Sequence, residues 1–108
     1  MLIVLGGGMQ SGNRETIAEL AKRERLPTVA HVRPYVDAGA LASYGHKVLP
    51  QYRFAAMYVH KILEGAKPAD LPVGPPTHFE LVINLNTAEA LGLAIPQSLL
   101  LRADDLIQ

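Results

Sequence analysis

Thr77 to Ile107 read THFELVINLNTAEALGLAIPQSLLLRADDLI, and this stretch decides the expected fold. In its first part, Phe79 to Leu85, apolar side chains occupy every second position, and the positions between them are mixed in character. Such alternation is typical of a strand with one less buried side. The stretch therefore predicts a strand followed by helices, and it carries almost no side chains suited to catalysis.

Two helices are expected after this strand. Asn86 is an N-cap candidate because a glutamate three residues later completes a capping box, and Gly92 ends this first helix. Pro96 begins the last helix, in which apolar residues recur at helical spacing. These residues are Leu99, Leu100, Ala103, Leu106 and Ile107. Asp104 and Asp105 are expected to form a solvated edge, because negative charge near a helix C-terminus opposes the helix dipole.

The N-terminal part predicts one βαβ unit. Leu2 to Leu5 form a continuous apolar run, as expected of a buried parallel strand. The glycine run Gly6 to Gly8 separates this strand from a helix that begins near Asn13, a plausible N-cap, and stops before Pro27. Thr28 to Val32 supply the second strand, and the crossover between the two strands is expected to be right-handed.

The middle of the chain predicts short elements and then a long helix. Pro34 to Ala38 favour a helical turn ended by Gly39, and Ala40 to Ser43 favour a short third strand. A helix from about Lys47 to Glu64 carries an apolar face with spacings of three and four. That face consists of Val48, Tyr52, Ala55, Val59 and Ile62, widened by Leu49, Ala56 and Leu63. Ala66 to Pro76 hold four prolines and predict an extended connector.

Composition excludes several classes of function. The 108 residues allow one domain with one core. Ten basic and ten acidic residues balance, so nucleic acid is not an expected partner, because phosphate binding needs an excess of positive charge. No run approaches the length of apolar sequence that spans a membrane. The chain has no cysteine, which excludes disulfides, thiolate metal sites and a cysteine nucleophile.

Candidate ligand-binding residues gather where the first two strands are expected to end. In parallel α/β sheets, ligands bind outside the carboxyl ends of the strands. The sequence places six residues there, and we predict that they face a binding site. They are Gly7, Gly8, Met9, Gln10, His31 and Arg33. For Arg33 a surface ion pair with Asp37 is an equally weighted alternative, and for the glycines the alternative is a flexible turn.

Ser43 and Tyr44 are further candidates. They are expected in a turn between a strand end and a helix start, where backbone amides, a hydroxyl and a phenol suit a carboxylate or an amide. The alternative is a simple turn with Tyr44 packed on the core. Ser43 lacks the flanking glycines of a nucleophile elbow, so a hydrolase is not expected. No nucleophile, base and orienting group can be assembled, and the protein is not expected to be an enzyme.

A nucleotide site is the alternative for the glycine run. Gly6, Gly8 and Ser11 nearly match the G-x-G-x-x-G fingerprint, and Arg33 after the second strand suits the 2′-phosphate of an NADP-type nucleotide. A P-loop is less well supported, because Asn13 and Arg14 replace the lysine and the hydroxyl residue that its chemistry needs. The remaining histidines show no metal spacing, so no metal or other cofactor is expected. They are His46, His60 and His78.

Three segments together resemble a known family. DAGALASYG (residues 37–45), KILEGAKPADLPV (61–73) and the stretch quoted first are similar to the end of the tryptophan/tyrosine-type ABC transporter substrate-binding proteins. The resemblance implies the periplasmic-binding-protein type I fold, in which two α/β lobes close on a small molecule. For this chain it implies a three-layer α/β segment with a mostly parallel sheet.

The resemblance also implies a division of the chain. Residues 1–45 would be a βαβ part of the second lobe, and residues 46–76 the long helix and the proline-rich connector. Residues 77–108 would be a returning strand and the C-terminal helices of the first lobe, and all three parts can pack as one domain. Two departures concern the candidate site. Gly6 to Gln10 replace a loop of proline and acidic type, and Ala30 to Val32 replace a more aromatic and acidic stretch.

Function and partners follow from the same resemblance. It implies a small organic solute, possibly an amino acid, an ABC transporter permease as partner and a periplasmic or extracytoplasmic location. The sequence shows no signal peptide, so a cytoplasmic location as expressed is the alternative. We expect a C-terminal fragment whose strands lack native neighbours, and therefore a domain-swapped homo-oligomer. A self-associating structural remnant without ligand is the third hypothesis.

Overall fold

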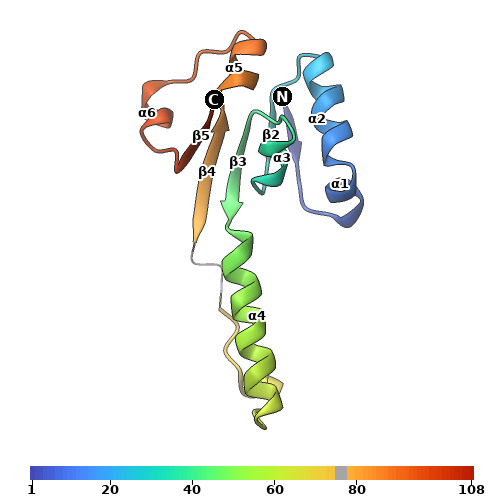
Figure 1. Cartoon of the computed structure of the whole chain (residues 1–108), viewed down its shortest axis with the longest axis vertical. Coiled ribbons are helices and arrows are strands. Elements are labelled where there is room, and N and C mark those ends of the chain that lie inside the picture. Colours follow the sequence, from blue (N-terminus) through green and yellow to red (C-terminus); the bar gives the residue numbers. More distant parts are fainter. Residues whose placement is uncertain (75–77) are drawn as a thin grey trace.

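Five strands form one mixed sheet, in the order β1-β2-β3-β4-β5, in the computed structural model of the chain (Figure 1). The structure describes residues 1–74 and 78–108. The strands β1, β2 and β3 are parallel to one another, β4 is antiparallel to β3, and β5 is parallel to β4. The strands are β1 (Leu2–Val4), β2 (Thr28–Ala30), β3 (Ala42–His46), β4 (Phe79–Asn84) and β5 (Asp105–Ile107).

Short helices connect these strands, and one long helix leaves the sheet. The helices are α1 (Gly8–Gly12), α2 (Arg14–Arg23), α3 (Pro34–Asp37), α4 (Val48–Leu63), the 3-10 helix η1 (Pro68–Asp70), α5 (Leu85–Ala90) and α6 (Gln97–Leu100). The predicted mixed α/β fold with a mostly parallel sheet is confirmed. The extended connector contains η1, and its residues 75–77 lie outside the described residues.

The predicted N-terminal βαβ unit is present. β1 pairs with β2 in parallel, with Leu2 opposite Thr28, and α2 forms the crossover between them. The second strand ends at Ala30, earlier than expected. The helix α2 begins at Arg14 with Asn13 at its N-cap position, as predicted, but the Asn13 side chain makes no cap hydrogen bond and the short helix α1 precedes it.

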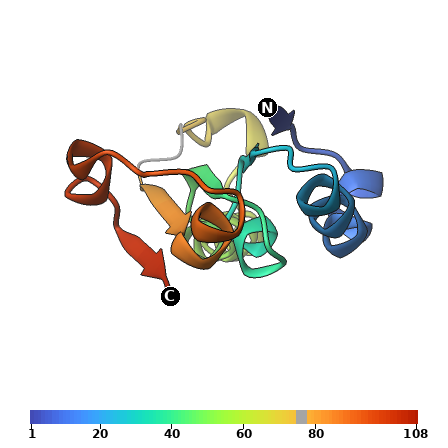
Figure 2. The ribbon, with the colours of Figure 1, turned by 90° about the horizontal axis from the view of Figure 1, so that it is seen from above.

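Helices cover one face of the sheet. α2, α3 and α5 lie on the same side of the strands when the molecule is seen from above (Figure 2). The main core cluster lies under α3, where Tyr35 packs with Val4, Ala30 and Ala40. Tyr35 is nearly inaccessible to solvent, so one aromatic ring fills much of this core.

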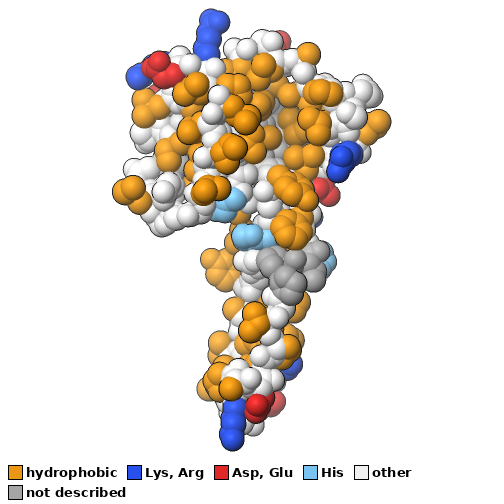
Figure 3. Space-filling model, turned by 180° about the vertical axis from the view of Figure 1, so that it is seen from behind, with side chains coloured by type: hydrophobic (Ala, Val, Ile, Leu, Met, Phe, Trp, Pro, Cys, Tyr) orange, Lys and Arg blue, Asp and Glu red, His pale blue; other side chains and the backbone are white. Residues whose placement is uncertain are grey.

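The opposite face of the sheet is apolar and open. Ile3, Tyr44 and Phe79 are exposed, and the register places their side chains on the same side because alternate residues share a face. Hydrophobic side chains gather over the body in the view from behind (Figure 3). The resemblance implied helical layers on both faces. Among the described residues, one of these layers is present.

The long helix α4 agrees with its sequence prediction, and its apolar face is not buried. It begins at Val48 and ends at Leu63, and Gly65 follows with φ 101°. A left-handed residue just past a helix end favours glycine, because glycine has no Cβ to clash in this conformation. None of the α4 residues is buried, and the helix projects from the body (Figure 1). Its own packing therefore contributes little to the core.

The prediction of a last amphipathic helix was wrong. α6 covers only Gln97–Leu100, and residues 105–107 form β5 instead. Two hydrogen bonds join Asp104, just before this strand, to Leu81 of β4. The Asp104 carboxylate accepts a hydrogen bond from the Leu81 backbone N–H at 2.8 Å, and the Asp104 backbone N–H donates to the Leu81 carbonyl at 2.9 Å. Asp104 is exposed, as predicted, and is in addition hydrogen-bonded to β4.

The predicted cap of α5 was also wrong by two residues. Asn84, the last residue of β4, is the N-cap, and its side chain accepts a hydrogen bond from the Thr87 backbone N–H at 3.0 Å. Its amide nitrogen donates to the Val36 carbonyl at 3.2 Å, and the side chain is buried. Asn84 therefore joins β4, α5 and α3, a role that the exposed Asn86 cannot have.

β4 has neighbours on both sides within the same chain, which contradicts the expectation of missing partners. Val82 lies opposite Ser43 of β3 and opposite Asp105 of β5. The sheet thus joins strands from residues 1–46 with strands from residues 79–107. The swapping of elements between copies is not needed to complete β4, and it stays a prediction, as does the assignment of segments to two lobes.

Candidate functional site

The carboxyl ends of β1 and β2 lie side by side at the same end of the sheet, because the two strands are parallel. This end, where the strands finish, is called the sheet edge below. The glycine run follows β1, and His31 follows β2. The two meet through Gly6: a Cβ added there would lie 3.2 Å from His31 Nε2. The structure thus brings the glycine turn and His31 together, as the sequence predicted, although the contact is made by Gly6.

His31 occupies a narrow space between two glycines. A Cβ added to Gly45 in β3 would overlap the His31 carbonyl oxygen. The imidazole also lies beside the Tyr35 ring, with ring centroids 5.7 Å apart and planes inclined by 55°. The backbone and the imidazole of His31 are therefore positioned by three neighbours: Gly6 after β1, Gly45 in β3 and Tyr35 in α3.

Three buried polar atoms near this edge have no hydrogen-bond partner among the described residues. They are His31 Nδ1, the Tyr35 hydroxyl and Ser43 Oγ. Ser43 lies opposite Ala30, the last residue of β2, which places it one residue from His31 along the sheet edge. Buried polar groups are nearly always hydrogen-bonded, so such atoms are typical of a place where water or a ligand is held.

The four residues of the predicted loop have different surroundings. Gly7 precedes α1, and its carbonyl accepts a hydrogen bond from the Ser11 N–H at 3.0 Å. The Gln10 side chain lies against Gly7, where an added Cβ would overlap it. A Cβ added to Gly8 would meet nothing within 4 Å, and the Met9 side chain is exposed. The turn is therefore folded on itself, with Gly6 nearest to His31.

Arg33 is held in an ion-pair network. Its Nη1 donates to Asp105 Oδ2 at 2.6 Å, and its Nε lies 3.4 Å from Asp37 Oδ1. The predicted alternative of an ion pair with Asp37 is confirmed, and Asp105 was not foreseen because it was assigned to a helix. The hydrogen bond from Arg33 holds the pKa of the Asp105 carboxyl below its usual value, aided by the Arg33 charge.

Ser43 and Tyr44 lie inside β3, so the prediction of a turn before the long helix was wrong. The strand runs from Ala42 to His46, two to three residues later than predicted. Ser43 is fully buried in the middle of the sheet, and Tyr44 is 64% exposed on the open face. Tyr44 stacks on Phe79, with centroids 6.0 Å apart and planes inclined by 24°. The two residues thus point to opposite faces and do not form one site.

Two residues near the edge were missed by the sequence analysis. Gly45 permits the close approach of β3 to His31, and Tyr35 covers the imidazole. A glycine inside a strand is a known sign of close backbone approach, so Gly45 carried a usable signal. Tyr35 carried none, because its contact depends on where α3 packs.

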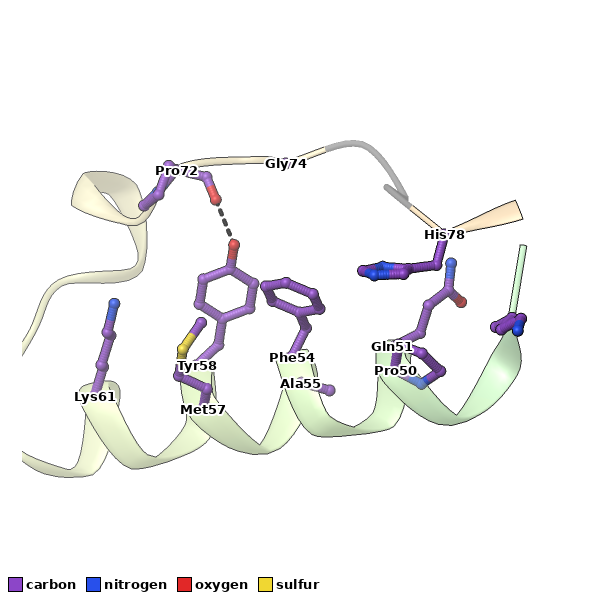
Figure 4. A pocket seen from close by; sticks show the side chains of 11 residues that line it. Pro50, Gln51, Phe54, Ala55, Met57, Tyr58, Lys61, Pro72, Gly74 and His78 are labelled. Atoms are coloured by element: carbon purple, nitrogen blue, oxygen red, sulfur yellow. Dashed lines mark hydrogen bonds between the residues drawn. The ribbon is translucent and has the colours of Figure 1, made fainter. Parts of the chain in front are cut away.

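A second hollow lies away from this edge, between α4 and the connector (Figure 4). Its volume is about 570 Å³, and its lining is mainly apolar. Phe54 and Tyr58 point from α4 toward the connector, and the Tyr58 hydroxyl donates to the Pro72 carbonyl at 2.6 Å. This hydrogen bond holds the connector against one side of α4. The sequence analysis did not predict this groove.

Within residues 1–74 and 78–108, no three histidine or acidic side chains come together in a group that could hold a metal ion. Over the same ranges, no helix is long and apolar enough to cross a bilayer.

Comparison with known proteins gives the family. Residues 3–107 match the ABC transporter substrate binding protein family. The chain belongs to this family of substrate-binding proteins. The resemblance proposed from three segments is therefore confirmed over almost the whole chain. No curated protein matches the sequence.

Solved structures agree with this membership. A conserved domain protein from Vibrio cholerae O1 biovar El Tor is 33% identical, with a TM-score of 0.92 over 96% of this chain and 35% of its own. An ABC domain in complex with L-Trp from Streptococcus pneumoniae is 26% identical, with a TM-score of 0.87 over 97% of this chain and 36% of its own. The chain thus spans about a third of the solved chains it matches.

A third structure supports the fold alone. It is the ligand-free, open structure of a substrate binding protein with adhesive properties from Clostridium difficile. It is 21% identical and has a TM-score of 0.63, over 99% of this chain and 36% of its own.

The nucleotide alternative finds no geometric support. A dinucleotide fingerprint requires a glycine turn that opens one continuous helix. In this chain the helix after Gly7 ends at Gly12, and Asn13 separates it from α2. Arg33, the residue suggested for a 2′-phosphate, is engaged by two carboxylates.

Proposed function

We propose that this chain supplies one wall of the binding site for a small organic solute in an ABC transporter substrate-binding protein. The wall is the edge formed by Gly6, Gly7 and His31, with Ser43 beneath it. Family membership over residues 3–107 supports the class of function. A solved chain of similar fold is described in complex with L-Trp, which supports a free amino acid as the class of solute.

The observation that carries the proposal is the placement of His31. Its imidazole lies at the carboxyl end of β2, beside the glycine turn, with Nδ1 buried and without a partner among the described residues. An imidazole can donate or accept a hydrogen bond, and glycines let a ligand approach the backbone closely. Both properties suit the amino and carboxylate groups of an amino acid.

One wall alone predicts weak binding. Ligand sites bury most of a small ligand, which a single sheet edge does not achieve. We therefore expect millimolar dissociation constants for this chain by itself. NMR titration of the ¹⁵N-labelled chain with L-Trp and a panel of other amino acids measures such affinities residue by residue. Shifts confined to residues 5–8 and 31–33 are the expected result.

A matched pair of histidine variants makes the test specific. His31→Ala should abolish the shifts. His60→Ala should leave them unchanged, because His60 lies on exposed α4 and pairs with Glu64 at 3.5 Å. If no amino acid in the millimolar range shifts these resonances, or if both variants behave like the wild type, the assignment of this edge as a binding wall is wrong.

Delivery to a transporter is part of the same proposal. A permease partner and an extracytoplasmic location rest on the family alone, since the chain covers about a third of the solved chains that it matches. Co-purification of the complete transporter components with a solute-loaded receptor that contains this chain would test the partnership.

A further inference from the structure

The feature that the proposed function leaves unexplained is the group of three buried polar atoms behind the sheet edge. They are His31 Nδ1, the Tyr35 hydroxyl and Ser43 Oγ, and none has a hydrogen-bond partner among the described residues. Tyr35 is 1% exposed and Ser43 is 0% exposed. A segment that packs on the outside of this chain does not reach atoms buried in this way. Their hydrogen-bond partners are therefore expected within the chain itself.

Strand register and packing place the two hydroxyls on the same side of the sheet. Ser43 lies opposite Ala30 in the neighbouring strand, so the two side chains share a face. Ala30 belongs to the core cluster that contains Tyr35. The imidazole of His31, which follows Ala30, lies against the Tyr35 ring with centroids 5.7 Å apart. The three polar groups therefore gather around Tyr35 at the end of β2.

The two nitrogens of the His31 imidazole have different surroundings. Nδ1 is buried with the hydroxyls, whereas Nε2 is the ring atom nearest to the glycine turn. A Cβ added to Gly6 would lie 3.2 Å from Nε2 but 3.6 and 3.7 Å from two carbons of the ring. The imidazole thus directs Nε2 toward the proposed binding wall and Nδ1 toward the interior.

The balance of donors and acceptors decides which nitrogen carries the hydrogen. A neutral imidazole has one donor and one acceptor nitrogen, and each hydroxyl brings one donor hydrogen. With the hydrogen on Nδ1, three buried donors would face only the two hydroxyl oxygens. With the hydrogen on Nε2, two buried donors face three acceptors. Buried donors without a partner are rarer than underused acceptors, so the second arrangement is favoured. A bridging water adds two donors and two acceptors and leaves this comparison unchanged.

We propose that the hydroxyls of Tyr35 and Ser43 hold His31 in the neutral form that carries its hydrogen on Nε2, and that this N–H donates to the carboxylate of the solute. The proposal rests on the proposed function and deepens it, because it names the solute group that meets His31. Tyr35 and Ser43 are positioning residues, since they act through the imidazole and do not touch the solute.

An N–H donor at the wall discriminates between the two charged groups of an amino acid. A carboxylate accepts hydrogen bonds, and bonds to an ionised acceptor are strong. An ammonium group has three donors and no acceptor, so it does not pair with a nitrogen that already carries a hydrogen. Arg33, the cation two residues after His31, is engaged by Asp37 and Asp105. The wall is therefore expected to favour solutes with a free carboxylate.

Nitrogen NMR of the free chain tests the arrangement of His31 without any solute. In a chain labelled with ¹⁵N-histidine, the chemical shift of each ring nitrogen reports whether that nitrogen carries a hydrogen. The measurement is made at about pH 8, where an unperturbed imidazole is neutral. We expect the hydrogen on Nε2 of His31. A hydrogen on Nδ1, or an equal mixture of the two neutral forms, overturns the proposal.

Two conservative variants test whether the hydroxyls are the cause. Tyr35→Phe and Ser43→Ala each remove one hydroxyl and keep most of the packing. Together they should lower the ratio of the Nε2–H form to the Nδ1–H form about fivefold, the effect of roughly one hydrogen bond. His60, which is exposed on α4, is the control in the same spectra and should not change. An unchanged ratio at His31 overturns the role of the hydroxyls. If the double variant does not fold, each single variant should show a smaller change in the same direction.

Two analogues of tryptophan test the contact with the carboxylate. N-acetyl-L-tryptophan keeps the carboxylate and lacks the ammonium group, whereas L-tryptophanamide keeps the ammonium group and lacks the carboxylate. We expect L-Trp and the acetylated compound to shift Nε2 of His31 in an NMR titration. The amide should bind about tenfold more weakly than L-Trp, because it loses a hydrogen bond to a charged acceptor.

The outcomes separate this inference from the proposed function. An amide that binds at residues 31–33 as tightly as L-Trp overturns the carboxylate contact and leaves the binding wall in place. If none of the three compounds shifts these residues, the binding wall and the carboxylate contact are both wrong. The position of the hydrogen on His31 is then still decided by the measurement on the free chain.

Discussion

Arg33 donates a hydrogen bond of 2.6 Å to Asp105, and the two residues are 72 positions apart in the sequence. Arg33 precedes α3, and Asp105 begins β5, so the contact joins the two parts of the sheet that come from opposite ends of the chain. Asp37 lies on the other side of the same guanidinium, 3.4 Å from Nε. Arg33, a predicted ligand-binding residue, thus has two carboxylate partners within the fold.

Replacement of Arg33 should loosen β5 without unfolding the protein. We expect Arg33→Gln to lower the Tm by about 2–5 °C, because a part-exposed ion pair contributes modestly to stability. Arg23→Gln is the matched control, since its pair with the neighbouring Glu24 is exposed and local. Thermal denaturation followed by circular dichroism measures both. Equal Tm values for the two variants would mean that the Arg33 contact does not stabilise the sheet.

The same contact predicts a dependence of stability on pH. The folded-state pKa of Asp105 is lowered, chiefly by the hydrogen bond from Arg33. The contribution to stability is therefore fully present above the unfolded-state pKa of about 3.9, and it is lost as the pH falls through the lowered folded-state value. The Tm difference between the wild type and Asp105→Asn should be largest at neutral pH and should vanish in strong acid. A difference that grows on acidification would contradict this assignment.

Gly45 should tolerate no side chain. An added Cβ would overlap the His31 carbonyl oxygen, so Gly45→Ala must push β3 away from the end of β2. We expect a loss of about 2–3 kcal/mol in the free energy of unfolding, as in other overpacked sites. Gly12→Ala is the control, because nothing lies within 4 Å of the added Cβ. Urea unfolding measures both, and a neutral Gly45→Ala would show that this contact yields easily.

Variants of Asn84 and Asn86 distinguish the observed N-cap of α5 from the predicted one. Asn84→Ala removes the acceptor for the Thr87 N–H and one of two donors to the Val36 carbonyl, which keeps the Gly39 N–H at 3.0 Å, and we expect a loss of about 2 kcal/mol. Asn86→Ala should change the stability by less than about 0.5 kcal/mol, because Asn86 is exposed. Urea denaturation of the two variants is the measurement, and the reverse order of effects would restore Asn86 as the cap.

Local patterns predicted much of this fold. The β1-α2-β2 unit, the turn that ends at Gly39 and the helix α4 followed from apolar runs, glycines and helical spacing. These signals act over a few residues, so they can be read without knowledge of distant contacts. The approach of the glycine turn to His31 also followed, since parallel strands bring their carboxyl ends to one edge.

Two of the wrong predictions, the last helix and the turn at Ser43 and Tyr44, share one cause. Leu106 and Ile107 continue a helical spacing, yet they form a strand, because β4 offers an edge and Asp104 binds Leu81 in register with it. Ser43 and Tyr44 looked like a turn, yet strand pairing with β4 draws them into β3. In both places hydrogen bonds to a strand distant in the sequence outweigh a weak local preference.

The sequence by itself determined that this is an α/β chain of the ABC transporter substrate binding protein family, with a long helix of apolar face between two sheet segments. Only the tertiary structure decided that α4 projects from the body, that β5 closes the sheet beside β4, and that Arg33 binds Asp105. The physical reason is that the spacing of apolar residues indicates which face of a helix or strand is apolar. Contacts between segments distant in the sequence decide which other element lies against that face.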